Sequence, residues 1–137
     1  ILGDNFSFTI TVDDSIDVTY ERIPSLILQP IVENALKHGL RTKQGEQKLN
    51  IEFTMEDNDE QTIMQITIED NGIGRKASAE LNKDRKQHQS FATKSIDDRI
   101  KIINATAGSE KMKMETMDVM EDNVVLGTKV QLSIIQG

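Results

Sequence analysis

Five short segments of this sequence have the composition and spacing of β-strands, and they constrain the fold more than any other feature. In the first, Phe6, Phe8, Ile10 and Val12 alternate with serine and threonine. Successive side chains of a strand point to opposite faces of a sheet, so this alternation predicts a half-buried strand. The five expected strands are residues 5–12, 49–55, 64–68, 111–119 and 127–135. Short polar turns join the second strand to the third and the fourth to the fifth as hairpins, so the expected sheet is mixed or antiparallel.

Two main helices are expected beside these strands. Apolar residues recur at helical spacing from residue 26 to about residue 38, where a glycine follows in the position of a C-terminal cap. Pro30 either belongs to the first turn of this helix or kinks it. The second helix is expected to begin after Ser95, which forms a capping box with Asp98, and to end at Gly108. The predicted fold is therefore α+β: a two-layer α/β sandwich with a mixed, mostly antiparallel sheet and helices on one face.

Composition limits what this chain can bind. Its 137 residues fit a single domain over residues 1–137. The formal net charge of −7 argues against nucleic acid as the main partner, although local lysines and backbone N–H groups can still bind phosphate. Cysteine is absent, which excludes disulfides and thiolate metal sites. The apolar runs are too short to cross a bilayer, and because the first residue is not Met we expect a fragment of a longer protein.

The first helix carries polar residues where a core-facing helix should carry none. Asn34 and His38 lie on or beside the face formed by Ile27, Ile31 and Ala35. A buried amide or imidazole without a partner costs about 1–3 kcal/mol. Either the protein itself satisfies these two side chains at a helix end, or the helix faces a polar ligand.

Two other short stretches allow an ordinary reading and a functional one. "DNGIG" at 70–74 follows a strand and reads as a turn, because Asn and Gly tolerate positive φ. Its two glycines also let the backbone approach a flat ligand or a phosphate closely. "GT" at 127–128 reads as the start of the last strand. Each stretch alone is weak evidence, and their order along the chain is more informative.

Together these stretches resemble the ATP-binding domain of sensor histidine kinases, within the gyrase–chaperone–histidine kinase–mismatch repair ATPase superfamily. "PSLILQPIVENALKHGL" is similar to the N box, in the form that LytS/YehU-type kinases carry. "IEDNGIGR" is similar to the G1 box, and "GTKVQLSI" to the closing strand of that domain. The resemblance implies a Bergerat-type ATP-binding fold with ATP and Mg²⁺ as cofactors.

The resemblance also implies roles for the N-box residues. Asn34 occupies the metal position, where its side-chain oxygen coordinates the Mg²⁺ that bridges the ATP phosphates. Oxygen ligands and few protein contacts are what Mg²⁺ prefers. Lys37 falls where a basic side chain reaches the phosphates, and His38 falls where a ring lies against the nucleotide.

The other two motifs supply the base pocket in this reading. Asp70 matches the acid that accepts a hydrogen bond from the adenine 6-amino group. A carboxylate only accepts, so the guanine carbonyl at that position would be repelled. Gly72 and Gly74 leave room for the base and the lid, and Thr128 supports Asp70 directly or through water.

Residues 75–94 are expected to form an ATP lid, read from the sequence as a short helix followed by a mobile segment. The candidates within it to contact phosphate are basic residues: Arg75, Lys76, Lys83, Arg85, Lys86 and Lys94. Many relatives carry a glycine-rich G2 box after the lid, whereas this chain has "HQSFATKSIDDRI". Residues 90–93 would then have to supply the backbone turn near the phosphates.

The chain also departs from the ATPase pattern. Those relatives place a glutamate one turn before the metal Asn to activate water, and this chain has Pro30, which cannot transfer a proton. Transfer to another group is therefore favoured over hydrolysis. In relatives of this type the acceptor is a histidine on an upstream dimerisation segment. His38 is assigned to the pocket and His88 to the lid, so we expect no catalytic or phospho-acceptor residue in this chain.

The function expected from the resemblance is the catalytic half of a two-component sensor histidine kinase. Its expected partners are its own dimerisation segment, in a homodimeric parent, and a response regulator. The expected location is a cytoplasmic domain of an inner-membrane sensor protein, without direct membrane contact. Two alternatives remain open: a nucleotide-binding regulatory module without transfer activity, and an α/β interaction domain with chance motifs.

Overall fold

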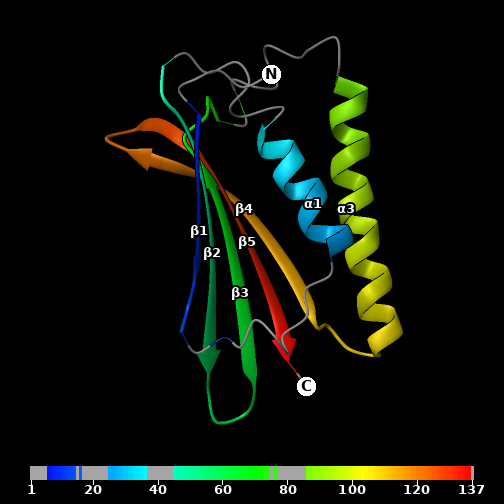
Figure 1. The fold of residues 1–137 in the computed structure, drawn as a ribbon. Helices are drawn as coiled ribbons and strands as arrows, with labels where there is room; N and C mark the ends of the chain where they lie inside the picture. The colour runs from blue at the N-terminus through cyan, green and yellow to red at the C-terminus, as the bar shows by residue number, and fades with distance from the viewer. Residues whose placement is uncertain are drawn as a thin grey trace.

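A computed structural model gives the fold and describes residues 6–14, 16, 25–36, 45–74, 76 and 86–136. In these residues five strands form one sheet, and the two long helices lie on the same side of it (Figure 1). The elements are β1 (Phe6–Val12), α1 (Ser25–Asn34), β2 (Gln47–Asp57), β3 (Thr62–Asp70), α3 (Lys86–Ala107), β4 (Met112–Glu121) and β5 (Val124–Gln136). None of the helices in the described ranges is both long and apolar enough to span a membrane.

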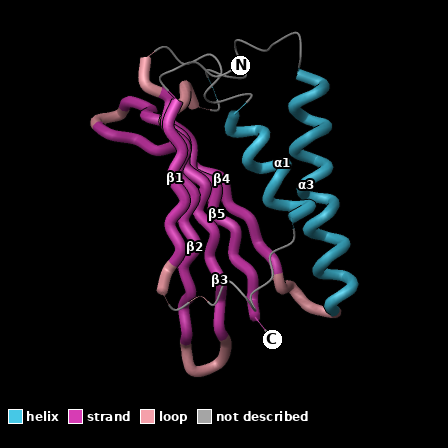
Figure 2. Tube along the Cα trace, viewed as in Figure 1, coloured by secondary structure: helices cyan, strands magenta, loops and turns pink. Residues whose placement is uncertain are grey.

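The sheet is mixed and mostly antiparallel, as predicted. Its strand order is β1-β2-β3-β5-β4 (Figure 2). β1 pairs with β2 in parallel, and the three other neighbouring pairs are antiparallel. Because β2–β3 and β4–β5 are hairpins, each strand of these two pairs needs only a short turn to reach its partner.

The strand register explains why one face of the sheet forms the core. Ile51, Ile68 and Val130 lie in one row across three neighbouring strands, and Phe53, Ile66 and Leu132 lie in the next. Helices α1 and α3 cover this face with Ile31 and Ile96, each only 3% exposed. The predicted two-layer sandwich is confirmed.

α1 differs from the expected helix in how Pro30 fits. It begins at Ser25, so Pro30 lies in its interior rather than in its first turn. After Asn34 the helix continues as a π-helical turn at Ala35 and Leu36. Helices widen in this way at single turns, often at functional sites. The expected continuation to His38 lies outside the described residues.

α3 begins earlier than expected, at Lys86 rather than after Ser95. The predicted capping box at Ser95 is therefore wrong, because Ser95 lies inside the helix. Residues 86–94 contain neither glycine nor proline, so nothing in the chain stops the helix from extending through them. The other end was predicted correctly: Gly108 has φ +75°, and the Ser109 N–H donates to the Asn104 carbonyl at 3.2 Å, as in a Schellman motif.

β1 is more exposed than its alternating sequence predicted. Phe8 is 48% exposed and Ile10 is 54% exposed, so the expected half-buried strand is wrong for these side chains. The cause is position: β1 is at the end of the strand order, with only β2 beside it. Alternation indicates which side chains of a strand lie on the same face of the sheet. It does not indicate whether the helical layer extends far enough to cover that face.

The β4–β5 hairpin is longer than expected. Its strands are joined at Asp122 and Asn123, which have φ of 51° and 65°. Positive φ at both central residues is the geometry of a type I′ turn, whose twist matches that of the strands it joins. The register of β3 with β5 ends at Asp70 and Thr128, whereas β5 begins at Val124. The hairpin thus extends beyond the end of β3 (Figure 1).

Candidate functional site

Three of the predicted site segments meet at one end of the molecule. The C-terminal end of α1, the end of β3 and the start of β5 lie at the upper end in Figure 1. These ends carry Asn34, Asp70 and Thr128 respectively. Lys37, His38 and Arg75 lie outside the described residues, so their assigned roles remain predictions.

Asp70 is a buried carboxylate at the last position of β3. Its residue is 5% exposed, and its Oδ1 accepts a hydrogen bond from the Gly72 N–H at 2.9 Å. In the sheet register Asp70 lies directly between Leu49 of β2 and Thr128 of β5. The predicted neighbourhood of Asp70 and Thr128 is therefore present. A buried carboxylate is costly unless it is hydrogen-bonded, and the Gly72 N–H supplies one such bond. The same bond fixes the orientation of the carboxylate.

Asn71, the next residue, ties the loop after β3 to the start of β2. Its backbone N–H donates to the Lys48 carbonyl at 3.1 Å, and its side-chain Oδ1 accepts from the Lys48 N–H at 2.7 Å. Its Nδ2 donates to the Glu46 carbonyl at 2.9 Å. The chain thus leaves the sheet at Asn71 while its side chain continues the pairing.

Close backbone packing requires glycine at position 127, whereas at position 74 a positive φ and a side-chain contact favour it. A Cβ placed on Gly127 would lie 2.8 Å from the Asp70 carbonyl carbon and 2.9 Å from the Asn71 Cα, with the Asp70 carbonyl oxygen closer still. Gly74 has φ +89°, and a Cβ there would lie 2.6 Å from Cγ1 of Val125. Gly72 and Gly74 are both buried. The loop after β3 is therefore packed against the start of β5, in the β4–β5 hairpin, on the side away from β2.

Asn34 is half-buried in the final turn of α1, just before the π-helical turn. The neighbouring Ile31 packs into the core, which fixes the helix against the sheet. No cluster of three or more His, Asp or Glu residues able to hold a metal is found within the described part of the chain. Asn34 offers one amide oxygen, a donor type that suits a Mg²⁺ whose other ligands come from phosphate and water.

The predicted lid is described only in part. Lys76 is exposed, residues 77–85 lie outside the described ranges, and the side chain of Lys94 is not described. The backbone of residues 86–94 belongs to α3. The expectation that residues 90–93 form a backbone turn is therefore wrong, because they are helical.

Sequence reasoning gave no role to Asn71 or Val125, and it treated Gly127 only as part of a motif. A signal existed for Asn71, since Asn side chains commonly hydrogen-bond nearby backbone where a strand ends. No local signal pointed to Val125 or to the close packing of Gly127. Both depend on how β5 lies against the end of β3.

Solved structures of histidine kinases superpose on nearly the whole of this chain. A histidine kinase domain from the Erythrobacter litoralis EL346 blue-light activated histidine kinase superposes with a TM-score of 0.54 at 11% identity, over 96% of this chain and 52% of that one. The catalytic domain of histidine kinase ThkA superposes with a TM-score of 0.54 at 19% identity, over 96% and 78%. The mycobacterial sensor histidine kinase MprB gives 0.52 at 11% identity, over 96% and 84%.

The fold is that of a histidine kinase catalytic domain. At these identities the likeness concerns the fold, and the chain spans about half the length of the Erythrobacter litoralis chain. No family model matches the sequence, and no curated protein sequence matches it either.

Proposed function

We propose that this chain binds Mg-ATP as the catalytic domain of a sensor histidine kinase of the LytS/YehU type. The observation that carries the proposal is the buried Asp70 at the end of β3, in a sheet with the histidine kinase catalytic fold. The loop that contains Gly72 and Gly74 follows Asp70, and Thr128 lies directly beside Asp70 on β5. The end of α1 that carries Asn34 lies at the same end of the molecule.

Asp70 would select adenine. Its carboxylate accepts hydrogen bonds and cannot donate one, so it suits the 6-amino group of adenine and disfavours the carbonyl of guanine. The Gly72 N–H holds Oδ1 in place. Burial makes the discrimination strong, because a buried polar group left without its partner is costly.

Asn34 would hold the Mg²⁺ that accompanies the triphosphate, with Lys37 and His38 beside the nucleotide. When bound, ATP supplies the γ-phosphoryl group, and Mg²⁺ offsets the charge of the phosphates. Pro30 lies on α1 where the ATPase relatives carry an acid, and it cannot take a proton from water. A bound ATP is therefore kept for transfer rather than hydrolysed.

The acceptor is proposed to be a histidine on an upstream dimerisation segment of a homodimeric parent. Phosphoryl transfer depends mainly on positioning and on charge stabilisation, so this chain needs that segment to act. A response regulator would then receive the phosphoryl group. We place the chain in the cytoplasm, as one domain of an inner-membrane sensor protein.

The proposed transfer is tested with γ-labelled ATP. The chain alone should bind ATP without becoming labelled, and adding the parent's dimerisation segment should give acid-labile label on that segment. Label on the chain alone would reveal an acceptor within it.

A regulatory module without transfer activity is the second candidate. It is favoured by the helical, glycine-free start of α3, where many relatives have a glycine-rich G2 box. Nucleotide binding with no label on the added segment would select this candidate.

Magnesium dependence should pass through Asn34. The Asn34→Ala variant removes one oxygen ligand and leaves the buried Ile31 in place, so we expect a folded chain whose nucleotide affinity no longer rises with Mg²⁺. The matched control is Gln29→Ala, which removes an exposed amide from the same helix. Titrations with and without Mg²⁺ measure the gain. An equal gain in the Asn34→Ala variant and the unaltered chain would exclude this role.

A further inference from the structure

Asn71 makes three hydrogen bonds to Lys48 and Glu46, two of them through its side chain. In an antiparallel ladder, a hydrogen-bonded pair of residues exchanges two bonds between their backbone groups. The register of β2 and β3 ends with Leu49 opposite Asp70, and one further step would place Lys48 opposite Asn71. The Asn71 N–H donates to the Lys48 carbonyl, as a ladder requires, but the Lys48 N–H donates to the side-chain Oδ1 of Asn71.

The side chain of Asn71 therefore replaces a backbone carbonyl in the ladder. At 2.7 Å this bond is short for an N–H···O bond, and the Nδ2 bond to the Glu46 carbonyl at 2.9 Å continues the pairing. The backbone of Asn71 is thus able to turn into the Gly72–Gly74 loop while the start of β2 stays attached. Asp70 is the last residue of β3 itself.

Asp70 is consequently held from both sides. On the β2 side, Asn71 fixes the chain immediately after Asp70. On the β5 side, Gly127 packs against the backbone of Asp70 and Asn71. The Gly72 N–H that orients the carboxylate belongs to the loop that Asn71 begins. Loss of the two side-chain bonds of Asn71 would loosen the loop on its β2 side, and with it the donor that orients Asp70.

We propose that Asn71 is a positioning residue that sets the adenine selectivity of the site through Asp70. This inference rests on the proposed function. Asn71 contacts β2 through its side chain, and it acts on the base only by fixing Asp70 and the Gly72 N–H. Its loss should therefore weaken recognition of adenine more than recognition of the triphosphate, which both ATP and GTP carry.

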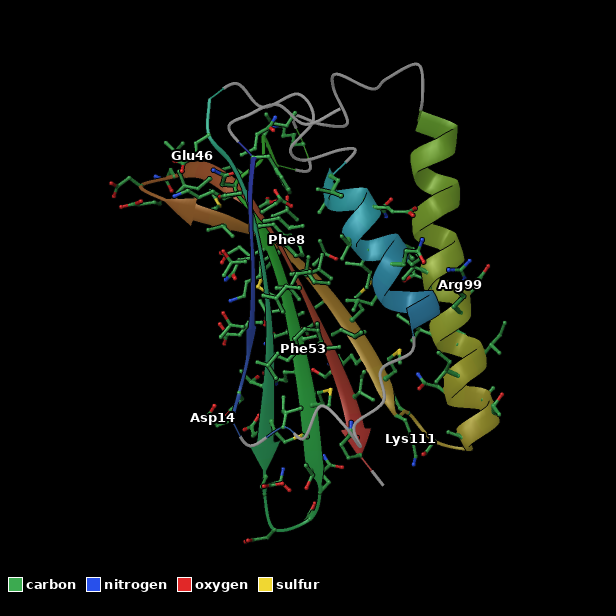
Figure 3. All side chains as sticks on the ribbon, viewed as in Figure 1. Phe8, Asp14, Glu46, Phe53, Arg99 and Lys111 are labelled. Carbon is green, nitrogen blue, oxygen red and sulfur yellow. The ribbon has the colours of Figure 1, made fainter. Side chains whose placement is uncertain are left out.

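The fold offers a matched control in Asn104. Its Oδ1 accepts from the N–H groups of Lys111 and Met112 at 2.9 Å, and its Nδ2 donates to the Met112 carbonyl at 2.9 Å. This asparagine thus ties α3 to β4 in the same way that Asn71 ties the loop to β2. Figure 3 labels Glu46 and Lys111 at opposite ends of the molecule, so the two asparagines separate a local effect from a general loss of stability.

The experiment measures ATP and GTP affinities by equilibrium titration at a temperature where thermal melts show every variant folded. Asn71→Ala should lower ATP affinity about tenfold, and the ATP-over-GTP preference by a similar factor, because a misplaced hydrogen-bonding group loses most of its discrimination. Asn104→Ala should lower the melting temperature and leave both affinities unchanged.

A second variant keeps the test decisive if Asn71→Ala does not fold. Asn71→Asp keeps the acceptor for the Lys48 N–H and loses the donor to the Glu46 carbonyl, so it should show an intermediate loss of preference. The added charge affects ATP and GTP equally, which leaves the ratio interpretable. A folded Asn71 variant with an unchanged ATP-over-GTP preference would overturn the inference alone. An unaltered chain that binds neither nucleotide would overturn the proposed function as well.

Discussion

The Gly127→Ala variant is expected to lose about 3 kcal/mol of its free energy of unfolding, because overpacking against backbone cannot be relieved by a rotamer change. The added Cβ would lie 2.8 Å from the Asp70 carbonyl carbon and 2.9 Å from the Asn71 Cα. Either β5 moves away from β3, or the end of β3 moves. Both movements displace Asp70, so nucleotide affinity should fall together with stability.

Gly108→Ala is the control for this prediction. A Cβ at Gly108 meets nothing within 4 Å, so the variant bears only the strain of an L-residue at φ +75°. That strain costs about 1–2 kcal/mol. Urea denaturation of the two variants separates the effects, with Gly127→Ala the less stable. Equal stability of Gly127→Ala and the unaltered chain would show that β5 does not lie against the end of β3 as described.

The Asp70→Asn variant is expected to bind ATP about 5- to 150-fold more weakly, which corresponds to a lost hydrogen bond of about 1–3 kcal/mol at a desolvated base. The Gly72 N–H requires an oxygen at the Oδ1 position. The amide oxygen will occupy that position, which leaves the NH₂ group at the other. A donor then stands where adenine needs an acceptor, so the ATP-over-GTP preference should disappear or reverse.

Glu69→Gln is the matched control for Asp70→Asn. Glu69 precedes Asp70 on β3 and therefore points to the opposite face of the sheet, while its replacement makes the same change in charge. Competition against a fluorescent adenine nucleotide measures both variants. We expect Glu69→Gln to bind ATP like the unaltered chain. A similar loss in both variants would indicate a general charge effect instead of a base contact.

Local patterns in the sequence were enough to predict the strands and the two hairpins of the sheet. Alternation at Leu49, Ile51, Ile66 and Ile68 placed these residues on one face, and polar turns placed the hairpins. Both signals act over a few residues, so they can be recognised without knowing the tertiary structure. The family resemblance assigned Thr128 to support Asp70, and the register places these two residues side by side.

Features that depend on distant parts of the chain could not be predicted in this way. The exposure of Phe8 depends on how far the helical layer reaches over β1, which no local pattern reports. The start of α3 was placed at a capping signal, although the residues before Ser95 can also form a helix. Gly127 and Asp70 lie 57 positions apart in the sequence, so their close approach depends on how β5 pairs with β3.

The central claim, that this chain is an adenine-nucleotide-binding domain, is tested most directly by calorimetric titration of the unaltered chain. A non-hydrolysable Mg-ATP analogue and its guanine counterpart should be compared under identical conditions. We predict saturable binding of one adenine nucleotide per chain, at least about fivefold tighter than the guanine nucleotide, since a misplaced acceptor at a desolvated base costs about 1–3 kcal/mol. Equal affinity for the two nucleotides, or no binding of either, would contradict the account.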